Sequence, residues 1–381
     1  MTVAQNKLKR TENMLTFNVE WFDPQASFKR PYRLSYYAHD ETVEMFDLKA
    51  HKVFLRRSNV GHIPISELFV GSTITICGRQ LQITDFGDDV TRLALIKRRE
   101  RSIVIVKPDF YERSGLLIQK IQEAGLSFAQ LKTMRLGRSE LTELFAIHDN
   151  HPKFNELIQY LSHKTLLVME VIGKDANSVV WDLVGEEDPE KARKVDPTTI
   201  RAQYGLDWVR NAVYVSLGLD TADQNYQILF GKKREPTAYI NRCAICVVLP
   251  HVLRENKLGQ VIESIFAEKT FKVSAMQIFQ VDRDSAFEFF EVYQDVWPEF
   301  SSKVTELCSG ECCALEIQGG PDVIQAFRDF CGPYDPAVSR YLNPVGLRTL
   351  YGTNRIYNGV HCTDLPEDGE LESEYFFKVL Q

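Results

Sequence analysis

The 381-residue sequence predicts an α+β protein in which a small all-β domain is followed by two copies of one α/β domain. Three observations lead to this fold class. Short runs of alternating apolar and polar residues fill the first hundred positions, strand and helix patterns alternate after about residue 102, and that second pattern recurs further along the chain. A chain of this length also exceeds a single hydrophobic core, which seldom grows past about 250 residues.

The composition is that of an ordinary globular protein and argues against two kinds of partner. Lys and Arg number 45 against 52 Asp and Glu, which gives a net charge of −7. A dedicated nucleic-acid binder normally carries a basic surplus, so nucleic acid is not expected as a partner. No apolar run reaches the ~20 residues that cross a bilayer, and the first residues lack the apolar core of a secretory signal. We therefore expect a cytoplasmic protein without a membrane partner.

The first expected element is a loose polar tail over residues 1–13, followed by a β domain over residues 14–101. The runs in this domain are rich in β-branched and aromatic residues, and turn signals such as Asp23-Pro24 and Gly87-Asp88 separate them. Five to seven strands are expected, in LTFNVEWF, PYRLSYYAH, TVEMFDL, KVFLRR, STITICG and RQLQITDFG. Without a conspicuous cluster of His, Asp or Cys, this domain is expected to bind or to scaffold.

The first α/β copy is expected over residues 102–230. SIVIVKPDF is typical of a buried strand, and GLLIQKIQEAG is typical of an amphipathic helix that ends at a glycine. A strand in SFAQLKTMRLG, helices in SELTELFAIH and FNELIQYLSH, and a strand in TLLVMEVIG follow. Alternation of this kind indicates an α/β or α+β domain.

The same order recurs over residues 243–381, after a linker at 231–242. The separation between matching positions drifts from 250 − 108 = 142 to 358 − 211 = 147, which a few small insertions explain. The aligned pairs include Pro108 with Pro250, Phe154 with Phe300, Arg201 with Arg348, and Asn211 with Asn358. The sequence therefore predicts an internal repeat.

Two spacings that suggest metal ligands receive a structural interpretation. Cys243 and Cys246 lie in an apolar, strand-like run and have no matching Cys/His pair, so buried reduced thiols are preferred. His148 and His151 lack a recurring partner and are interpreted as a solvated helix end. No metal site formed by the protein itself is predicted.

Each copy carries a Lys-Pro or Leu-Pro pair after its first strand and, later, an Arg…Asn-x-x-(Tyr or His) segment. In these features the chain resembles the nucleoside diphosphate kinase family, whose domain opens with a strand ending in Lys-Pro-Asp and has its nucleophilic histidine in an Arg-Asn-x-x-His-Gly-Ser-Asp segment. The arrangement resembles the ciliary tandem members of that family, and WFDP, TVEMFDLK and VFLRR resemble the DM-ten domain of axonemal proteins. The resemblance implies a PH-like β domain followed by two ferredoxin-like α/β sandwiches.

For the second copy, the resemblance implies that His361 is the nucleophile and that Glu372 orients it. The implied nucleotide contacts are Arg328, Arg348 and Asn358. Mg²⁺ with the nucleotide is the implied cofactor if ATP/ADP or GTP/GDP binds.

The second copy also departs from the family pattern at three positions. Leu249 stands in place of the family's lysine, while Glu291 and Glu299 fall on positions of a tyrosine and a base-stacking phenylalanine. A cation on the transferring phosphoryl group is worth about 10²–10³ in rate, and leucine supplies none. Slow or absent phosphotransfer is expected.

In the first copy, Lys107, Arg201 and Asn211 match nucleotide-contacting positions of the family. Tyr214 stands at the nucleophile position and cannot form a phosphohistidine, and Asn225 replaces the orienting glutamate. This copy is expected to be inactive and at most to hold a nucleotide weakly.

Two hypotheses about function follow, and both remain open at this point. The first, ranked higher, is a structural component of ciliary axonemal doublet microtubules, with tubulin and other axonemal proteins as partners and a link to γ-tubulin complexes. Its implied locations are the cytoskeleton, the cilium or flagellum axoneme, and the basal body or centrosome. The second is a nucleoside diphosphate kinase that acts through phospho-His361.

Overall fold

The computed structural model describes residues 14–23, 28–61, 63, 68, 72–88, 91 and 100–381, which belong to two compact units, residues 1–99 and 100–381. The expected polar tail at residues 1–13 lies outside the described residues. Within the described part of the chain, no helix combines the length and the apolar character needed to cross a membrane.

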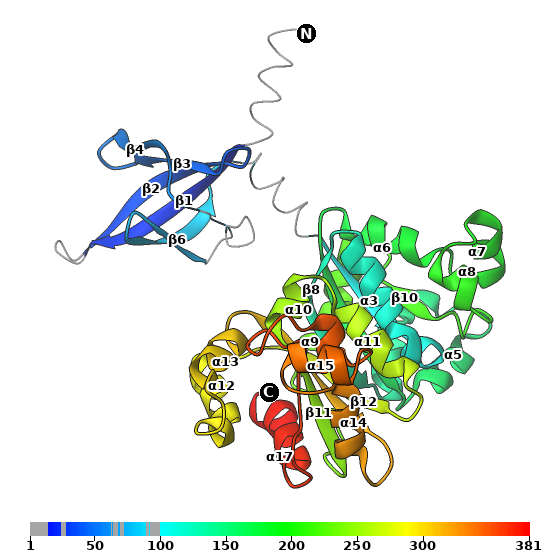
Figure 1. Ribbon diagram of the computed structural model, residues 1–381. Helices are drawn as coiled ribbons and strands as arrows, with labels where there is room; N and C mark the ends of the chain where they lie inside the picture. The colour runs from blue at the N-terminus through cyan, green and yellow to red at the C-terminus, as the bar shows by residue number, and fades with distance from the viewer. Residues whose placement is uncertain are drawn as a thin grey trace. The chain divides into compact units, whose positions relative to one another are not determined.

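The first unit contains an antiparallel sheet of six described strands in the order β4-β3-β2-β1-β6-β5 (Figure 1). Its core is formed by alternate residues of these strands, such as Phe17 and Val19, because successive side chains of a strand point to opposite faces. The strands are β1 (Met14–Asp23), β2 (Phe28–Tyr37), β3 (Thr42–Asp47), β4 (Lys52–Asn59), β5 (Thr73–Ile76) and β6 (Arg79–Phe86). The prediction of a small all-β domain with five to seven strands is confirmed.

The second unit is built on one eight-stranded antiparallel sheet in the order β10-β7-β9-β8-β12-β13-β11-β14. The first copy contributes β7 (Glu100–Val106), β8 (Ser127–Arg135), β9 (Thr165–Gly173) and β10 (Val213–Val215). The second contributes β11 (Cys243–Val248), β12 (Lys272–Gln280), β13 (Glu311–Gln318) and β14 (Val360–Cys362). Both copies therefore have the same strand order, with the fourth strand beside the first and the third between first and second, and the predicted repeat is confirmed.

Helices cover both faces of this sheet (Figure 1). Those of the first copy are η2 (Pro108–Arg113), α3 (Ser114–Glu123), α4 (Arg138–Leu144), η3 (Ala146–His148), α5 (Phe154–Leu161), α6 (Ala176–Val184), α7 (Pro189–Val195), α8 (Ile200–Tyr204) and α9 (Leu219–Phe230). Those of the second are α10 (Pro250–Arg254), α11 (Leu258–Ala267), α12 (Arg283–Phe290), η4 (Glu291–Tyr293), α13 (Phe300–Leu307), α14 (Val323–Cys331), α15 (Pro336–Leu342), α16 (Leu347–Tyr351), α17 (Asp368–Glu374) and a π-helical turn η5 (Tyr375–Val379).

The two copies join edge to edge and share one core. Strands β8 and β12 meet in antiparallel fashion at Lys132 and Gln277, which makes the sheet continuous across the repeats. On one face of the sheet α3 lies beside α11 (Figure 1). The two helices meet at Gly115 and Gly259, where a Cβ on Gly115 would lie 2.5 Å from the Gly259 carbonyl oxygen. Buried apolar residues of both copies form a single cluster on this face. The tandem copies are therefore a fused pair.

Each copy contains an Asp-Pro pair at the start of a helix, Asp188-Pro189 at α7 and Asp335-Pro336 at α15. Asp188 and Asp335 are N-caps whose carboxylates accept backbone N–H groups, from Glu190 at 2.9 Å and from Ala337 at 2.8 Å. The prolines that follow occupy the first helical turn, where the missing N–H has no cost. These motifs shape the segments before α8 and α16.

Candidate functional site

His361 lies on the edge strand β14, paired with Val247, and is buried. Its Nε2 lies 2.9 Å from Oε1 of Glu372, which α17 contributes. A carboxylate accepts hydrogen bonds, so Nε2 carries the proton and Nδ1 keeps its lone pair. Phe289 and Phe290 pack edge-on against the imidazole, with ring centroids 5.2 and 5.5 Å away. The structure thus holds one histidine in a defined tautomer and orientation.

The equivalent position of the first copy holds Tyr214, paired with Ile105 on β7. Its hydroxyl accepts a hydrogen bond from Asn225 Nδ2 at 2.8 Å, so this pair stands where the second copy has His361 and Glu372. Burial raises the pKa of the Tyr214 phenol, which therefore stays protonated at neutral pH.

The predicted phosphate-binding arginines Arg201 and Arg348 are buried and bind backbone carbonyls. Arg201 donates to Gly185 O at 2.6 Å, and Arg348 donates to Gly332 O at 2.8 Å and to Val360 O at 3.2 Å. Arg201 therefore holds the loop between α6 and α7, and Arg348 holds the equivalent loop between α14 and α15. A guanidinium has five N–H donors, so these bonds do not exhaust either residue.

Arg328 is exposed and forms an ion pair with Asp364 Oδ1 at 3.2 Å. Together with Arg348 and Tyr334 these residues line a cavity of about 450 Å³. The structure therefore brings the two predicted arginines of the second copy to one cavity, although His361 is not among the residues that line it.

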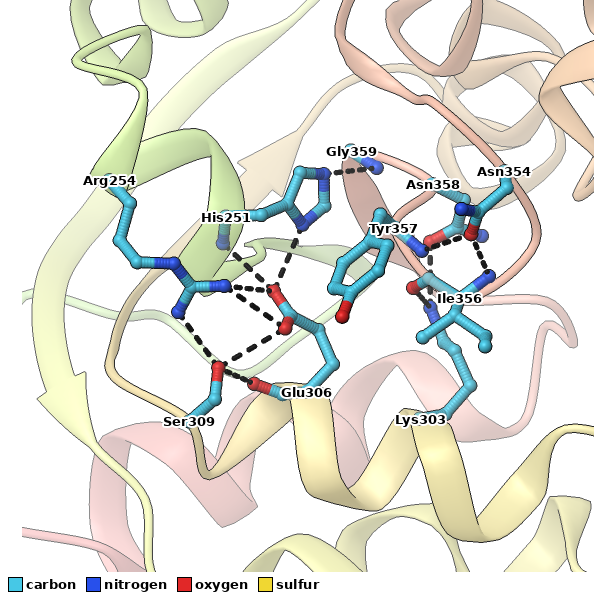
Figure 2. A network of polar contacts seen from close by, with 10 residues as sticks. All are labelled: His251, Arg254, Lys303, Glu306, Ser309, Asn354, Ile356, Tyr357, Asn358 and Gly359. Carbon is cyan, nitrogen blue, oxygen red and sulfur yellow. Dashed lines mark hydrogen bonds and ion pairs between the residues drawn. The ribbon is translucent and has the colours of Figure 1, made fainter. Parts of the chain in front are cut away.

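The predicted asparagines bind a lysine in both copies. Asn211 Oδ1 accepts a hydrogen bond from Lys107 Nζ at 2.6 Å. Lys107 is the lysine that the sequence comparison matched to a nucleotide-contacting position. Asn358 Oδ1 accepts from Lys303 Nζ at 2.7 Å, although position 249 is leucine (Figure 2). Sequence reasoning missed Lys303, a buried lysine on α13. The sequence does contain a sign that Lys303 is buried, because it lies next to Val304 on the apolar side of an amphipathic helix.

Beside Lys303, a second network surrounds Glu306, one turn along α13 (Figure 2). Glu306 Oε1 accepts from the backbone N–H of His251 at 2.8 Å and lies 3.0 Å from its Nδ1. Arg254 Nη2 lies 3.1 Å from Glu306 Oε2. The Gly359 N–H donates to His251 Nε2 at 3.3 Å, so the ring proton is on Nδ1. This network ties α13 to the loop that precedes His361.

Glu291 and Glu299 stand at two aromatic positions of the family pattern, but the surroundings of His361 still contain aromatic rings. Glu291 is exposed and Glu299 forms an ion pair with Arg355 at 3.3 Å. Aromatic side chains nevertheless face the site, because η4 turns Tyr293 toward His361, with ring centroids 6.0 Å apart. The ring of Trp297 stacks on Tyr293 at 3.9 Å and lies 5.2 Å from Tyr334.

The space around Tyr214 in the first copy is nearly filled. The cavity between Lys107, Arg201, Asn211 and Tyr214 measures about 10 Å³, at the lower limit for a single water molecule. Its wall includes Phe145, Leu157, Trp208 and His148. A nucleotide has no room there in this conformation.

His148 ends η3, as the helix-end interpretation expected, but both histidines are half-buried and contact other side chains. His151 stacks on Trp208 with ring centroids 3.5 Å apart, and His148 lies 3.5 Å from Glu187. Cys243 and Cys246 are buried free thiols in β11. Over the described ranges, no three His, Cys, Asp or Glu side chains come together in a way that could hold a metal ion.

Comparison with known proteins gives consistent matches along the chain. Residues 100–234 and 242–381 match the family model "Nucleoside diphosphate kinase", and residues 9–97 match "Nucleoside diphosphate kinase 7 N-terminal PH domain". The PH-like character of the first domain and the kinase fold of the repeats are thereby confirmed. The DM-ten assignment is not, because the matching model describes a PH domain.

Individual relatives agree with these models. Over 376 residues, the chain is 38% identical to "Nucleoside diphosphate kinase homolog 7" of Rattus norvegicus and of Mus musculus, with 98% of this chain and 95% of each relative covered. It is also 34% identical over 133 residues to "Nucleoside diphosphate kinase" of Aquifex aeolicus (strain VF5), a match that covers 34% of this chain and 92% of that protein.

Proposed function

Because the chain belongs to the nucleoside diphosphate kinase family, we propose that its second repeat transfers phosphoryl groups between nucleotides through His361. The observation that carries the proposal is the contact of His361 Nε2 with Glu372, which leaves Nδ1 as the nucleophile. Nδ1 attacks the terminal phosphorus of a nucleoside triphosphate, and the P–O bond to the leaving diphosphate breaks with its electron pair. An oxygen of a second nucleoside diphosphate then attacks the phosphohistidine and restores the imidazole.

The surroundings of His361 support this chemistry. Arg328 and Arg348 line one cavity of this repeat and offer donors to phosphate oxygens, while Tyr334 on the same wall offers an aromatic ring for a base. Members of this family generally use Mg²⁺ with the nucleotide. Asp364 on the cavity wall is the carboxylate that would hold such an ion, which would neutralise charge on the phosphate oxygens.

Incubation of the purified chain with γ-labelled ATP tests the proposal. Acid-labile, base-stable label is expected in the wild type and is expected to vanish in His361→Ala. Tyr214→Phe changes the equivalent position of the first repeat and should keep the label, which makes it the matched control. A wild type without label, or a labelled His361→Ala chain, would contradict the proposal.

We propose a structural role as a second function. The first repeat favours it, because its pocket is nearly filled while its sheet and core are continuous with those of the second repeat. A repeat that is closed to nucleotides still fixes its neighbour and presents a rigid surface. The resemblance to ciliary tandem members suggests tubulin, other axonemal proteins and γ-tubulin complexes as partners, and the axoneme, basal body or centrosome as the place.

Co-sedimentation with microtubules tests this second function. The wild type and His361→Ala should sediment equally, since docking does not use the nucleophile. A tagged chain that stays diffuse in ciliated cells and does not sediment with microtubules would exclude the structural role and leave the transferase proposal intact.

A further inference from the structure

Lys107 and Lys303 reach equivalent points of the two repeats from different elements. Lys107 follows β7, and its Nζ lies 2.6 Å from Asn211 Oδ1 and 3.0 Å from Val209 O. Lys303 comes from α13, and its Nζ lies 2.7 Å from Asn358 Oδ1 and 3.2 Å from Ile356 O. The acceptors correspond pairwise, because 358 − 211 and 356 − 209 both equal 147. Two ammonium groups thus bind the same amide and the same carbonyl of the repeated loop.

The difference between the repeats is an exchange of two side chains. Leu249 is the counterpart of Lys107 at a separation of 142, and Leu157 is the counterpart of Lys303 at a separation of 146. All four residues are buried, the leucines at 1% and 2% exposure. Each repeat therefore has one lysine and one leucine at this pair of positions, with the places reversed, so that charge and approximate volume are kept.

Burying an ammonium group is costly unless it is bound, so a buried lysine at a new position needs an explanation. Burial, with a smaller effect of the nearby Arg348, lowers the pKa of Lys303 to about 7, and burial likewise lowers that of Lys107 to about 7. The environments of the two groups therefore agree in electrostatics as well as in contacts. An ammonium has three donors, and the two acceptors named above leave one for a further group.

We propose that Lys303 supplies the phosphoryl-binding cation of the second repeat, in place of the lysine that position 249 lacks. The proposal rests on the phosphotransfer function proposed above and adds a residue to its site. It also revises the expectation that the second repeat is without this charge. Leu249→Lys alone is expected to lower the rate of phosphotransfer, because a second ammonium group would crowd that of Lys303.

The neighbouring contacts show how α13 is held so that Lys303 can act. In the first repeat the Ala212 N–H donates to Asp109 Oδ2 at 2.9 Å, and Tyr160 donates to Asp109 Oδ1 at 3.0 Å. In the second repeat the equivalent Gly359 N–H donates to His251, which Glu306 binds (Figure 2). Glu306 lies three residues after Lys303 and fixes that turn of α13 to α10 and the loop. The position of Lys303 on α13 is therefore fixed by contacts of the same helix turn, although the side chain is 1% exposed and must be uncovered before a phosphate reaches it.

The test compares three variants of the full chain, with the initial rate of His361 labelling by γ-labelled ATP as the first measurement. Lys303→Leu should lower this rate about 10²–10³-fold, the usual effect of losing one preorganised donor. The double variant Leu249→Lys with Lys303→Leu recreates the arrangement of the first repeat and should recover to within about tenfold of wild type. Lys269→Leu removes an exposed lysine of the same repeat and serves as the control.

Thermal melting of each variant separates loss of the cation from loss of the fold. A folded Lys303→Leu chain that labels like the wild type would overturn this inference and leave the proposed function standing. A folded double variant that stays as slow as Lys303→Leu would overturn it as well.

If the wild type takes no label, the affinity of each variant for ADP with Mg²⁺, measured by calorimetry, tests whether Lys303 binds phosphate. The absence of label would end the proposed transferase function. The inference would still gain support from weaker ADP binding in Lys303→Leu that the double variant restores. Equal affinities in all variants, or no binding in the wild type, would overturn it.

Discussion

Tyr214 and His361 occupy the same position in two copies of one fold, Tyr214 paired with Ile105 and His361 with Val247 on the adjacent strand. Both pairs of partners are related by the repeat, since 247 − 105 = 142 and 361 − 214 = 147. The backbone therefore presents both side chains alike. The chemical difference between the repeats comes from the side chains that surround these two positions.

Giving the first repeat its missing nucleophile should not make it active. In a His361→Ala background, Tyr214→His with Asn225→Glu is expected to take no label from γ-labelled ATP, because the pocket of about 10 Å³ has no room for phosphates. Adding Trp208→Ala removes a large side chain from its wall and should permit labelling at position 214. Label in the chain that retains Trp208 would show that the pocket opens by itself.

Removing the carboxylate that orients His361 should slow phosphotransfer. Glu372→Ala takes away the acceptor 2.9 Å from Nε2, so the ring loses its defined tautomer, and the initial rate of labelling should fall about 10²-fold. Glu370→Ala, on the same helix, removes a carboxylate that accepts from the Arg242 N–H and should leave the rate unchanged. A Glu372→Ala chain as fast as that control would remove Glu372 from the mechanism.

The buried ammonium of Lys303 should make the stability of the chain depend on pH. Its folded-state pKa of about 7 is lowered by burial from an unfolded value near 10.5. Between these values the unfolded state binds more protons, so the free energy of unfolding should rise with pH. Compared with Lys303→Met, the wild type should therefore gain stability from pH 7 to pH 10 in denaturant titrations. A constant difference between the two chains would show that Lys303 keeps an ordinary pKa.

The contact between α3 and α11 should tolerate no added atom. Gly115→Ala places a Cβ 2.5 Å from the Gly259 carbonyl oxygen and 2.7 Å from the backbone nitrogen of Glu263, so the helices must separate. A loss of about 1–3 kcal/mol in the free energy of unfolding is expected. Gly320→Ala meets nothing within 4 Å and should change it by less than about 0.5 kcal/mol. Equal effects of the two changes in urea titrations would argue against a tight crossing.

Local patterns were sufficient to predict most of the fold and part of the candidate site. The strand periodicity and the short motifs that match between copies depend on residues that are close in sequence, and the motifs also occur twice. The family resemblance implies positions for His361, Asn358 and Glu372, because Asn358 and His361 belong to one short motif around β14 and Glu372 follows it on α17. Their contacts agree with those positions, since Glu372 meets His361 and Asn358 meets a lysine.

The sequence by itself therefore determined the fold class and the internal repeat, and the family resemblance of its motifs pointed to His361 as the candidate nucleophile. Only the tertiary structure decided which cation stands beside Asn358 and that the space around Tyr214 is nearly filled. A lysine on an amphipathic helix is normally solvated, and Lys303 is buried only because α13 packs against a loop 53 to 55 residues further along the chain. Likewise, Trp208 closes the first pocket through its stack with His151, and Tyr293 faces His361 because of one turn of η4. Contacts between distant segments depend on how whole elements pack, and the spacing of residues along one element does not contain that information.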